Sequence, residues 1–107
     1  MLAKARLEAA GIRVPAELVT ADDVKRGKPH PDPYLLGAER LGFAAEDCVV
    51  FEDAIAGAVA AEAAGVGLIV GVTAAALAGP ADIVIRDLSG ITFDGEVLYL
   101  PDSNRLR

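Results

Sequence analysis

Apolar runs without polar alternation recur along the chain and are separated by helical patterns. Residues 49–51 and 67–72 are continuous apolar stretches, which is typical of parallel strands covered on both faces. The alanine-rich stretch 54–64 lies between them and is followed by Gly65, so the pattern predicts a covering helix that ends at this glycine. Residues 82–85, an aspartate followed by three branched apolar residues, predict a third strand.

The amino-terminal part of the chain continues this alternation. Helical spacing predicts a helix over residues 2–10, and residues 18–20 predict a short strand. Asp32 followed by Pro33 predicts another helix start, with the aspartate as the cap, and Gly42 predicts its end. The buried face of this helix is expected to consist of Leu35, Leu36, Ala38 and Leu41.

The pattern is weaker toward the carboxyl end. Residues 74–78 predict a short helical turn, and residues 97–100 predict a last strand, with a frayed end from Pro101 onward. The tail 88–107 is otherwise not assigned. Strands that alternate with helices indicate an α/β fold, with a mostly parallel, Rossmann-like sheet and flanking helices in one domain over residues 1–107.

Composition and charge narrow the classes of function. The chain has 107 residues, is 53% hydrophobic and carries a formal net charge of −6. This acidic balance argues against a nucleic-acid-binding surface. No apolar run approaches the roughly 20 residues that a membrane-spanning helix needs, and no signal-peptide core is visible, so we expect a cytoplasmic protein. Cys48 is the only cysteine and begins an apolar run, which predicts a small buried residue.

Two adjacent acids follow the first of the long apolar runs. Glu52 and Asp53 stand where the strand over 49–51 is expected to turn into the helix over 54–64. The carboxyl ends of parallel strands form the ligand crevice of open α/β sheets, so two carboxylates there can hold a hard cation such as Mg²⁺. The alternative is that Asp53 caps the helix and that Glu52 is solvated.

A stiff loop presents one lysine. In the stretch 27–33 a glycine and three prolines surround Lys28 and His30, and such a backbone can hold an ammonium group in place for a phosphate. The stretch does not match a Walker A loop, because Asp22 and Pro29 stand where that motif needs glycine and Ser or Thr. The alternative is a solvated lysine in a proline-rich turn.

Taken together, these two motifs resemble those of the haloacid dehalogenase (HAD) superfamily. The sequence Gly-Lys-Pro-His-Pro-Asp at 27–32 is followed, about twenty residues later, by Val-Val-Phe-Glu-Asp-Ala at 49–54 with Gly57 and Gly65. The order and spacing are most similar to the sugar-phosphatase and β-phosphoglucomutase-like branch. The resemblance implies that Lys28 is a catalytic residue that neutralises the phosphoryl group, and that Glu52 and Asp53 hold Mg²⁺. It implies no role for His30.

The resemblance also shows what is missing. The family's Asp-x-Asp nucleophile motif and its Ser/Thr motif are absent from the chain; the weak echo around Asp94 has Glu96 in place of the second aspartate. The chain is thus expected to correspond to the carboxy-terminal half of a Mg²⁺-dependent phosphatase core that acts on a small phosphorylated metabolite through an aspartyl-phosphate. Alone it is expected to be inactive and to bind Mg²⁺ weakly or not at all.

The missing half has a structural consequence. In the family, the nucleophile strand pairs beside the strand that carries the two acids, so its absence is expected to open a sheet edge along residues 49–51. We therefore expect a homo-oligomer or a partner chain. The alternative function is a non-catalytic assembly module that completes its sheet in this way.

Overall fold

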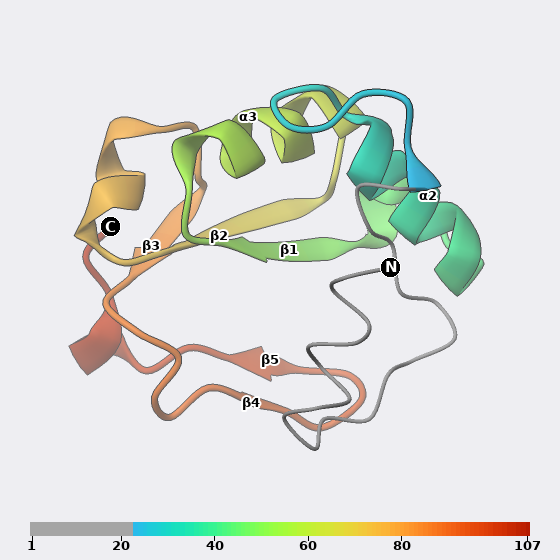
Figure 1. Ribbon diagram of the computed structural model, residues 1–107. Helices are drawn as coiled ribbons and strands as arrows, with labels where there is room; N and C mark the ends of the chain where they lie inside the picture. The colour runs from blue at the N-terminus through green and yellow to red at the C-terminus, as the bar shows by residue number, and fades with distance from the viewer. Residues whose placement is uncertain (1–22) are drawn as a thin grey trace, which may run out of the picture.

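A computed structural model describes residues 23–107; the helix expected over 2–10 and the strand expected over 18–20 lie outside this range. Within it, strands β1 (Val49–Glu52), β2 (Leu68–Val72) and β3 (Ile83–Ile85) form a parallel sheet in the order β1-β2-β3 (Figure 1). The expected α/β fold with a parallel sheet is therefore confirmed.

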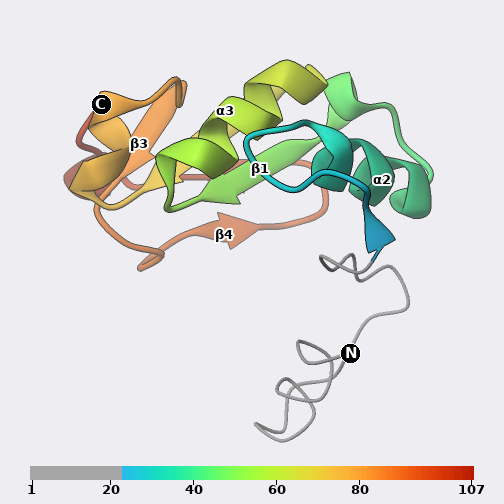
Figure 2. The ribbon, with the colours of Figure 1, turned by 45° about the horizontal axis from the view of Figure 1, so that its top comes forward.

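Helices α2 (Asp32–Leu41) and α3 (Ile55–Ala64) lie on the same side of this sheet (Figures 1 and 2). Each ends at a glycine in the left-handed conformation, Gly42 at φ 80° and Gly65 at φ 76°. Glycine adopts this conformation without a steric penalty, which confirms both predicted helix ends. Neither helix, nor any other in the described range, is long and apolar enough to cross a membrane.

Small side chains bring α3 close to the sheet. Its buried residues are all alanine or glycine, and the strands beneath supply larger branched residues such as Ile69 and Val84. The short 3₁₀ helix Ala74–Ala78, which confirms the helical turn expected there, completes this layer. The core cluster consists of Ala58, Ala61, Ile69, Ala76, Ala81 and Val84.

The outer strand β1 is less buried than its sequence predicts. Val49 is 46% exposed and Phe51 is 40% exposed, so the expectation of a strand covered on both faces was wrong. In the described range β1 pairs with β2 only, and the helices cover the opposite face from the one that Val49 and Phe51 share. An uninterrupted apolar run therefore does not reveal that its strand stands at the margin of the sheet.

Two expectations for α2 were also wrong. Leu35 and Leu41 are exposed, because α2 packs against α3 and the 3₁₀ turn Ala45–Asp47 at the margin of the sheet, with Ala38 as its buried residue. The N-cap is Pro31, not Asp32. The Asp32 carboxylate instead accepts a hydrogen bond from the Arg26 guanidinium at 3.0 Å, and it lies in the first helical turn, where negative charge is favourable.

An antiparallel hairpin lies on the side of the sheet away from the helices (Figures 1 and 2). It consists of β4 (Thr92–Phe93) and β5 (Leu98–Tyr99), of which β5 confirms the last expected strand in a shorter form. Its turn is held by Asp94, whose Oδ1 accepts the backbone N–H groups of Glu96 at 2.8 Å and Val97 at 2.7 Å.

The carboxyl-terminal residues are ordered against β3, so the expectation of a frayed end after Pro101 was wrong. After the 3₁₀ turn Asp102–Asn104, Arg105 forms an antiparallel bridge with Ile85. The Arg107 guanidinium donates hydrogen bonds to the carbonyl oxygens of Leu77 at 3.0 Å, Gly79 at 3.2 Å and Ala81 at 2.5 Å. The tail thus closes the β3 edge of the sheet.

The close packing at Gly71 in β2 can be tested by substitution. A Cβ atom there would lie 2.4 Å from the Ala76 Cβ and 3.0 Å from the Ala81 Cβ. Both atoms are attached directly to backbone, so Gly71→Ala should lower the free energy of unfolding by about 1–3 kcal/mol. Gly27→Ala, where a Cβ meets nothing within 4 Å, should change it by less than about 0.5 kcal/mol. Urea unfolding followed by circular dichroism measures the free energy of unfolding of both variants. Equal losses in the two variants would contradict the close packing at Gly71.

Candidate active site

The two adjacent acids lie in different environments. Glu52 is the last residue of β1 and is only 8% exposed, whereas Asp53 is exposed at the start of the turn into α3. Successive side chains of a strand point to opposite faces, and the Glu52 side chain points to the face that carries α2 and α3. The alternative of a solvated Glu52 therefore does not hold.

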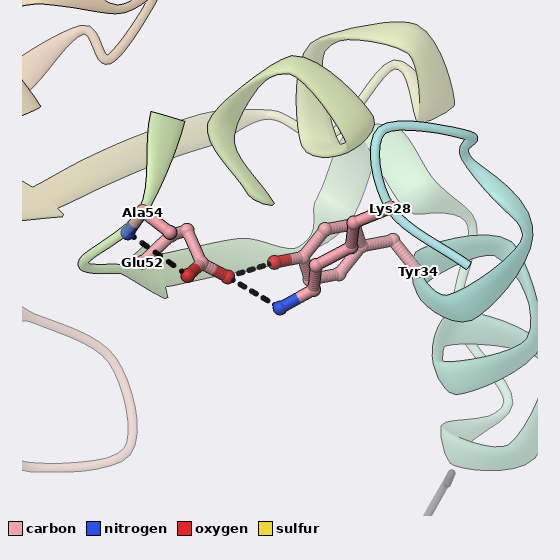
Figure 3. A network of polar contacts seen from close by, with 4 residues as sticks. All are labelled: Lys28, Tyr34, Glu52 and Ala54. Carbon is pink, nitrogen blue, oxygen red and sulfur yellow. Dashed lines mark hydrogen bonds and ion pairs between the residues drawn. The ribbon is translucent and has the colours of Figure 1, made fainter. Parts of the chain in front are cut away.

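The Glu52 carboxylate collects three donors from two separate parts of the chain (Figure 3). Its Oε2 accepts hydrogen bonds from Lys28 Nζ at 2.7 Å and from the Tyr34 hydroxyl at 2.5 Å. Its Oε1 accepts the backbone N–H of Ala54 at 3.1 Å. These contacts satisfy a buried charge that would otherwise be costly.

Lys28 is held between this carboxylate and an aromatic ring. Its Nζ lies 5.4 Å from the centroid of the Tyr34 ring, within the range of a cation–π contact. The side chain remains 42% exposed. Because an ammonium group has three N–H donors and Glu52 engages one of them, the site can offer positive charge and donors to an anion at its open side.

These contacts set the protonation states of the site. Burial by itself raises the pKa of the Glu52 carboxyl, but the hydrogen bonds from Lys28, Tyr34 and the backbone outweigh it and lower the pKa to about 2. Burial, with the hydrogen bond to Glu52, raises the pKa of the Tyr34 hydroxyl well above its ordinary value. At neutral pH Glu52 is therefore an anion, and Tyr34 is a neutral donor.

Asp53 is available for a ligand. The N-cap of α3 is Ala54 without a side-chain hydrogen bond, so the alternative in which Asp53 caps the helix was wrong. Among residues 23–107 no hydrogen bond engages its carboxylate, and an exposed carboxylate is the kind of ligand that Mg²⁺ accepts. Glu52 fits a metal less well, since both of its oxygens already accept hydrogen bonds. No group of three or more metal-ligating side chains occurs in the described range.

Three further residues that the sequence drew attention to take no part in this hydrogen-bond network. Asp94 stands in the β4–β5 turn on the other side of the sheet, and its hydrogen bonds from the backbone of Val97 and Glu96 lower its pKa. His30 is exposed in the loop before α2. Cys48 is only partly buried, in contrast to the expectation, and its thiol donates to the Ala44 carbonyl oxygen at 3.4 Å.

Tyr34 is the site residue that sequence reasoning missed. It occupies the first turn of α2, just after the lysine loop, and its hydroxyl reaches Glu52 across 18 positions of the chain. A tyrosine directly after a proline-rich loop was the available signal. Its pairing with the acid depends on where α2 lies relative to β1, which the local sequence does not specify.

Known proteins resemble this chain over the region that holds the site. A family model for haloacid dehalogenase-like hydrolases matches residues 1–65. Hexitol phosphatase A of Escherichia coli is 56% identical over 64 residues, which cover 60% of this chain and 30% of that protein. Glycerol-1-phosphate phosphohydrolase 2 of Saccharomyces cerevisiae is 48% identical over 71 residues, covering 60% of this chain and 28% of that protein.

Solved structures extend the similarity to the fold. A hydrolase from Pseudomonas syringae superposes with a TM-score of 0.68 at 32% identity, over 80% of this chain and 43% of that one. A HAD hydrolase from Entamoeba histolytica gives a TM-score of 0.66 at 28% identity, over 82% of this chain and 41% of that one. The chain thus spans less than a third of those two curated relatives and less than half of these two structures.

The contribution of the Lys28–Glu52 pair to stability should depend on pH. The pKa of Glu52 is about 2 in the folded chain against an ordinary value of 4.5, so the pair stabilises the fold fully above about pH 4.5. This contribution is lost as pH falls toward 2, because the unfolded chain takes up the proton first. Lys28→Met should cost up to about 1 kcal/mol at pH 7, since the lysine is partly exposed, and the difference from wild type should shrink between pH 4.5 and 2.

Urea unfolding in metal-free buffer at several pH values measures this difference. Lys25→Met is the matched control, because Lys25 is an exposed lysine three residues earlier, and its effect should not vary with pH. A Lys28→Met difference that stays constant from pH 7 to pH 2.5 would show that Lys28 does not stabilise the ionised Glu52.

Proposed function

Because the chain belongs to the family of haloacid dehalogenase-like hydrolases, we propose that it forms the lysine and metal side of a phosphatase site for a small phosphorylated metabolite. The observation that carries this proposal is the Lys28–Glu52 ion pair with the exposed Asp53 carboxylate next to it. The similarity of the chain to hexitol phosphatase A and to glycerol-1-phosphate phosphohydrolase 2 supports this class of substrate.

In this proposal Lys28 is the catalytic residue and acts on charge. Phosphoryl transfer accumulates negative charge on the transferred oxygens, and a fixed cation next to them lowers the barrier. Glu52 orients the Lys28 ammonium group by accepting one of the three N–H donors of that group. The Tyr34 ring lies next to the same ammonium group. The remaining donors of Lys28 are those that bind the phosphoryl group.

Asp53 would hold Mg²⁺, with Glu52 as the second acid next to it. When bound, the metal would supply further positive charge toward the phosphoryl oxygens. One free carboxylate is a weak site, because the other positions around an octahedral Mg²⁺ would be filled by water. The chain by itself is therefore proposed to bind the ion weakly.

The attacking group comes from outside these residues. The sequence contains no Asp-x-Asp motif, and covalent phosphoryl transfer of this type requires a carboxylate nucleophile. We therefore propose that an amino-terminal half with such a motif, on the strand that pairs with β1, completes the enzyme. Its aspartate would attack phosphorus and displace the dephosphorylated alcohol of the metabolite, and activated water would then hydrolyse the aspartyl-phosphate to inorganic phosphate and the free carboxylate.

The proposal predicts no turnover of p-nitrophenyl phosphate or sugar phosphates by the chain alone. Adding a fragment that carries an Asp-x-Asp-x-Thr strand and the Ser/Thr motif should restore Mg²⁺-dependent turnover. In the restored enzyme Lys28→Ala should reduce kcat by about 100-fold or more, because a charge-stabilising group is lost, whereas Lys25→Ala should have little effect. Phosphate release measures the rates. Turnover by the chain alone that is lost in Asp94→Asn would overturn the proposal.

A second candidate function is a non-catalytic assembly module. It is favoured by the difference between the two edges of the sheet: the tail residues pair with β3, whereas β1 pairs with β2 only within residues 23–107. A groove of about 260 Å³ runs beside β1, with Tyr34 and Leu41 of α2 and Val49 of β1 in its lining. An outer strand with exposed apolar side chains is a template for pairing with another chain.

If β1 pairs between copies, the chain should sediment as a dimer or larger oligomer at micromolar concentration. Val49→Lys should shift the population toward monomer, because a charge on an outer strand opposes pairing. Leu77→Lys, at a residue that is similarly exposed (40%) but lies in the 3₁₀ helix near β3, should not. Analytical ultracentrifugation measures the distribution, and a folded wild-type monomer would rule out the assembly function for the chain by itself.

A further inference from the structure

Gly57 lies in the first turn of α3, directly against the Glu52 side chain. A Cβ atom at this position would lie 2.0 Å from Glu52 Cδ, 2.2 Å from Oε2 and 2.4 Å from Cγ. The three nearest heavy atoms are thus all from Glu52. Gly57 has a negative φ, since it is not among the glycines in the left-handed region, so its backbone conformation does not explain why glycine is needed.

The missing side chain provides the space in which the carboxylate lies. Non-bonded carbon atoms approach to about 3.5 Å at best, so a Cβ at residue 57 would displace the Glu52 carboxylate by more than about 1 Å. Hydrogen bonds tolerate a few tenths of an ångström before they weaken. The bonds of Oε2 to Lys28 at 2.7 Å and to Tyr34 at 2.5 Å would therefore break.

The helix itself would tolerate the change. Alanine is a better helix former than glycine, and most of α3 is already alanine. The atoms in the way belong to the far end of a long side chain, which can swing aside at little cost to the backbone. The effect of a methyl group at residue 57 should therefore fall on the position of Glu52 and not on the formation of α3.

We propose that Gly57 is a positioning residue of the site: its lack of a side chain seats the Glu52 carboxylate, which in turn fixes the ammonium group of Lys28. The effect of Gly57 on catalysis rests on the proposed function, whereas its effect on the position of Glu52 does not depend on that function. The two can therefore be tested separately.

A double-mutant cycle tests the seating without any activity. Thermal unfolding is measured for wild type, Gly57→Ala, Glu52→Ala and the double variant. Gly57→Ala should lower the melting temperature in the wild-type background. In the Glu52→Ala background it should leave the melting temperature unchanged or raise it, because the obstructing atoms are gone and alanine favours the helix. Equal losses in both backgrounds would overturn the proposal.

The position of Lys28 provides a second readout that general destabilisation would not change. The Tyr34 ring should shift the NMR signals of the Lys28 ε-methylene group, because the ammonium lies 5.4 Å from the ring centroid. Gly57→Ala should remove this shift to the same extent as Glu52→Ala. Gly67→Ala is the control, since its Cβ would meet the Glu46 carbonyl oxygen at 2.3 Å, before β2 begins and away from Glu52. It should destabilise the chain and leave the shift in place.

Reconstitution with an amino-terminal half tests the catalytic consequence. Gly57→Ala should lower kcat to the level of Glu52→Ala, and the double variant should be no slower than either. If wild type shows no turnover, the proposed function fails, while the cycle and the NMR shift still decide the role of Gly57. If turnover is restored and Gly57→Ala retains the wild-type kcat and the Lys28 shift, the positioning role is wrong.

Discussion

A buried negative charge governs how the described part of this chain is arranged. Glu52 is 8% exposed, and an ionised carboxylate is tolerated there only with donors on its oxygens. Three elements meet that need: the loop before α2 brings Lys28, α2 brings Tyr34, and the turn into α3 brings the Ala54 amide. The same contact therefore links the helical layer to β1 and holds the partly exposed ammonium group of Lys28 in place.

The two edge strands of the sheet, β3 and β1, differ in how far the rest of the described chain covers them. At β3, Arg105 forms a backbone bridge with Ile85. The Arg107 guanidinium donates hydrogen bonds to backbone carbonyl groups in the segment 77–81, which precedes β3. At β1, Val49 and Phe51 keep a large exposed fraction on the face away from the helices. The site lies at the end of this less covered strand, so any chain that pairs with β1 also arrives next to Lys28 and Asp53. The proposed assembly and the proposed catalysis thus both depend on β1.

The chain corresponds in length to only part of the proteins that it resembles. The chain belongs to a hydrolase family, yet it covers 43% of a structural neighbour that it matches with a TM-score of 0.68. The described segment contains one partly exposed lysine next to two carboxylates, and the proposed function assigns to these groups the stabilisation of phosphoryl charge. In the proposed reaction the lysine would act on the phosphoryl oxygens and the attacking carboxylate on phosphorus, so the two groups could come from separate parts of a protein.

The sequence by itself determined the order and type of most elements that the structure describes. Alternating apolar runs and helical patterns specify the parallel sheet, and Gly42 and Gly65 specify where the helices end, because these signals depend on local backbone geometry. The motifs also singled out Lys28, Glu52 and Asp53. Their assigned roles in catalysis and metal binding stay predictions.

Only the tertiary structure decided how these parts meet. Lys28 and Glu52 are 24 positions apart, and they meet because the loop before α2 and the first turn of α2 face the end of β1. Glu52 and Asp53 are neighbours in sequence but differ in burial, since a strand turns successive side chains to opposite faces. The marginal place of β1, the exposure of Leu35 and the pairing of Arg105 with β3 follow from which elements end up adjacent. Apolar periodicity cannot encode this, because it records that a face is hydrophobic and not what covers it.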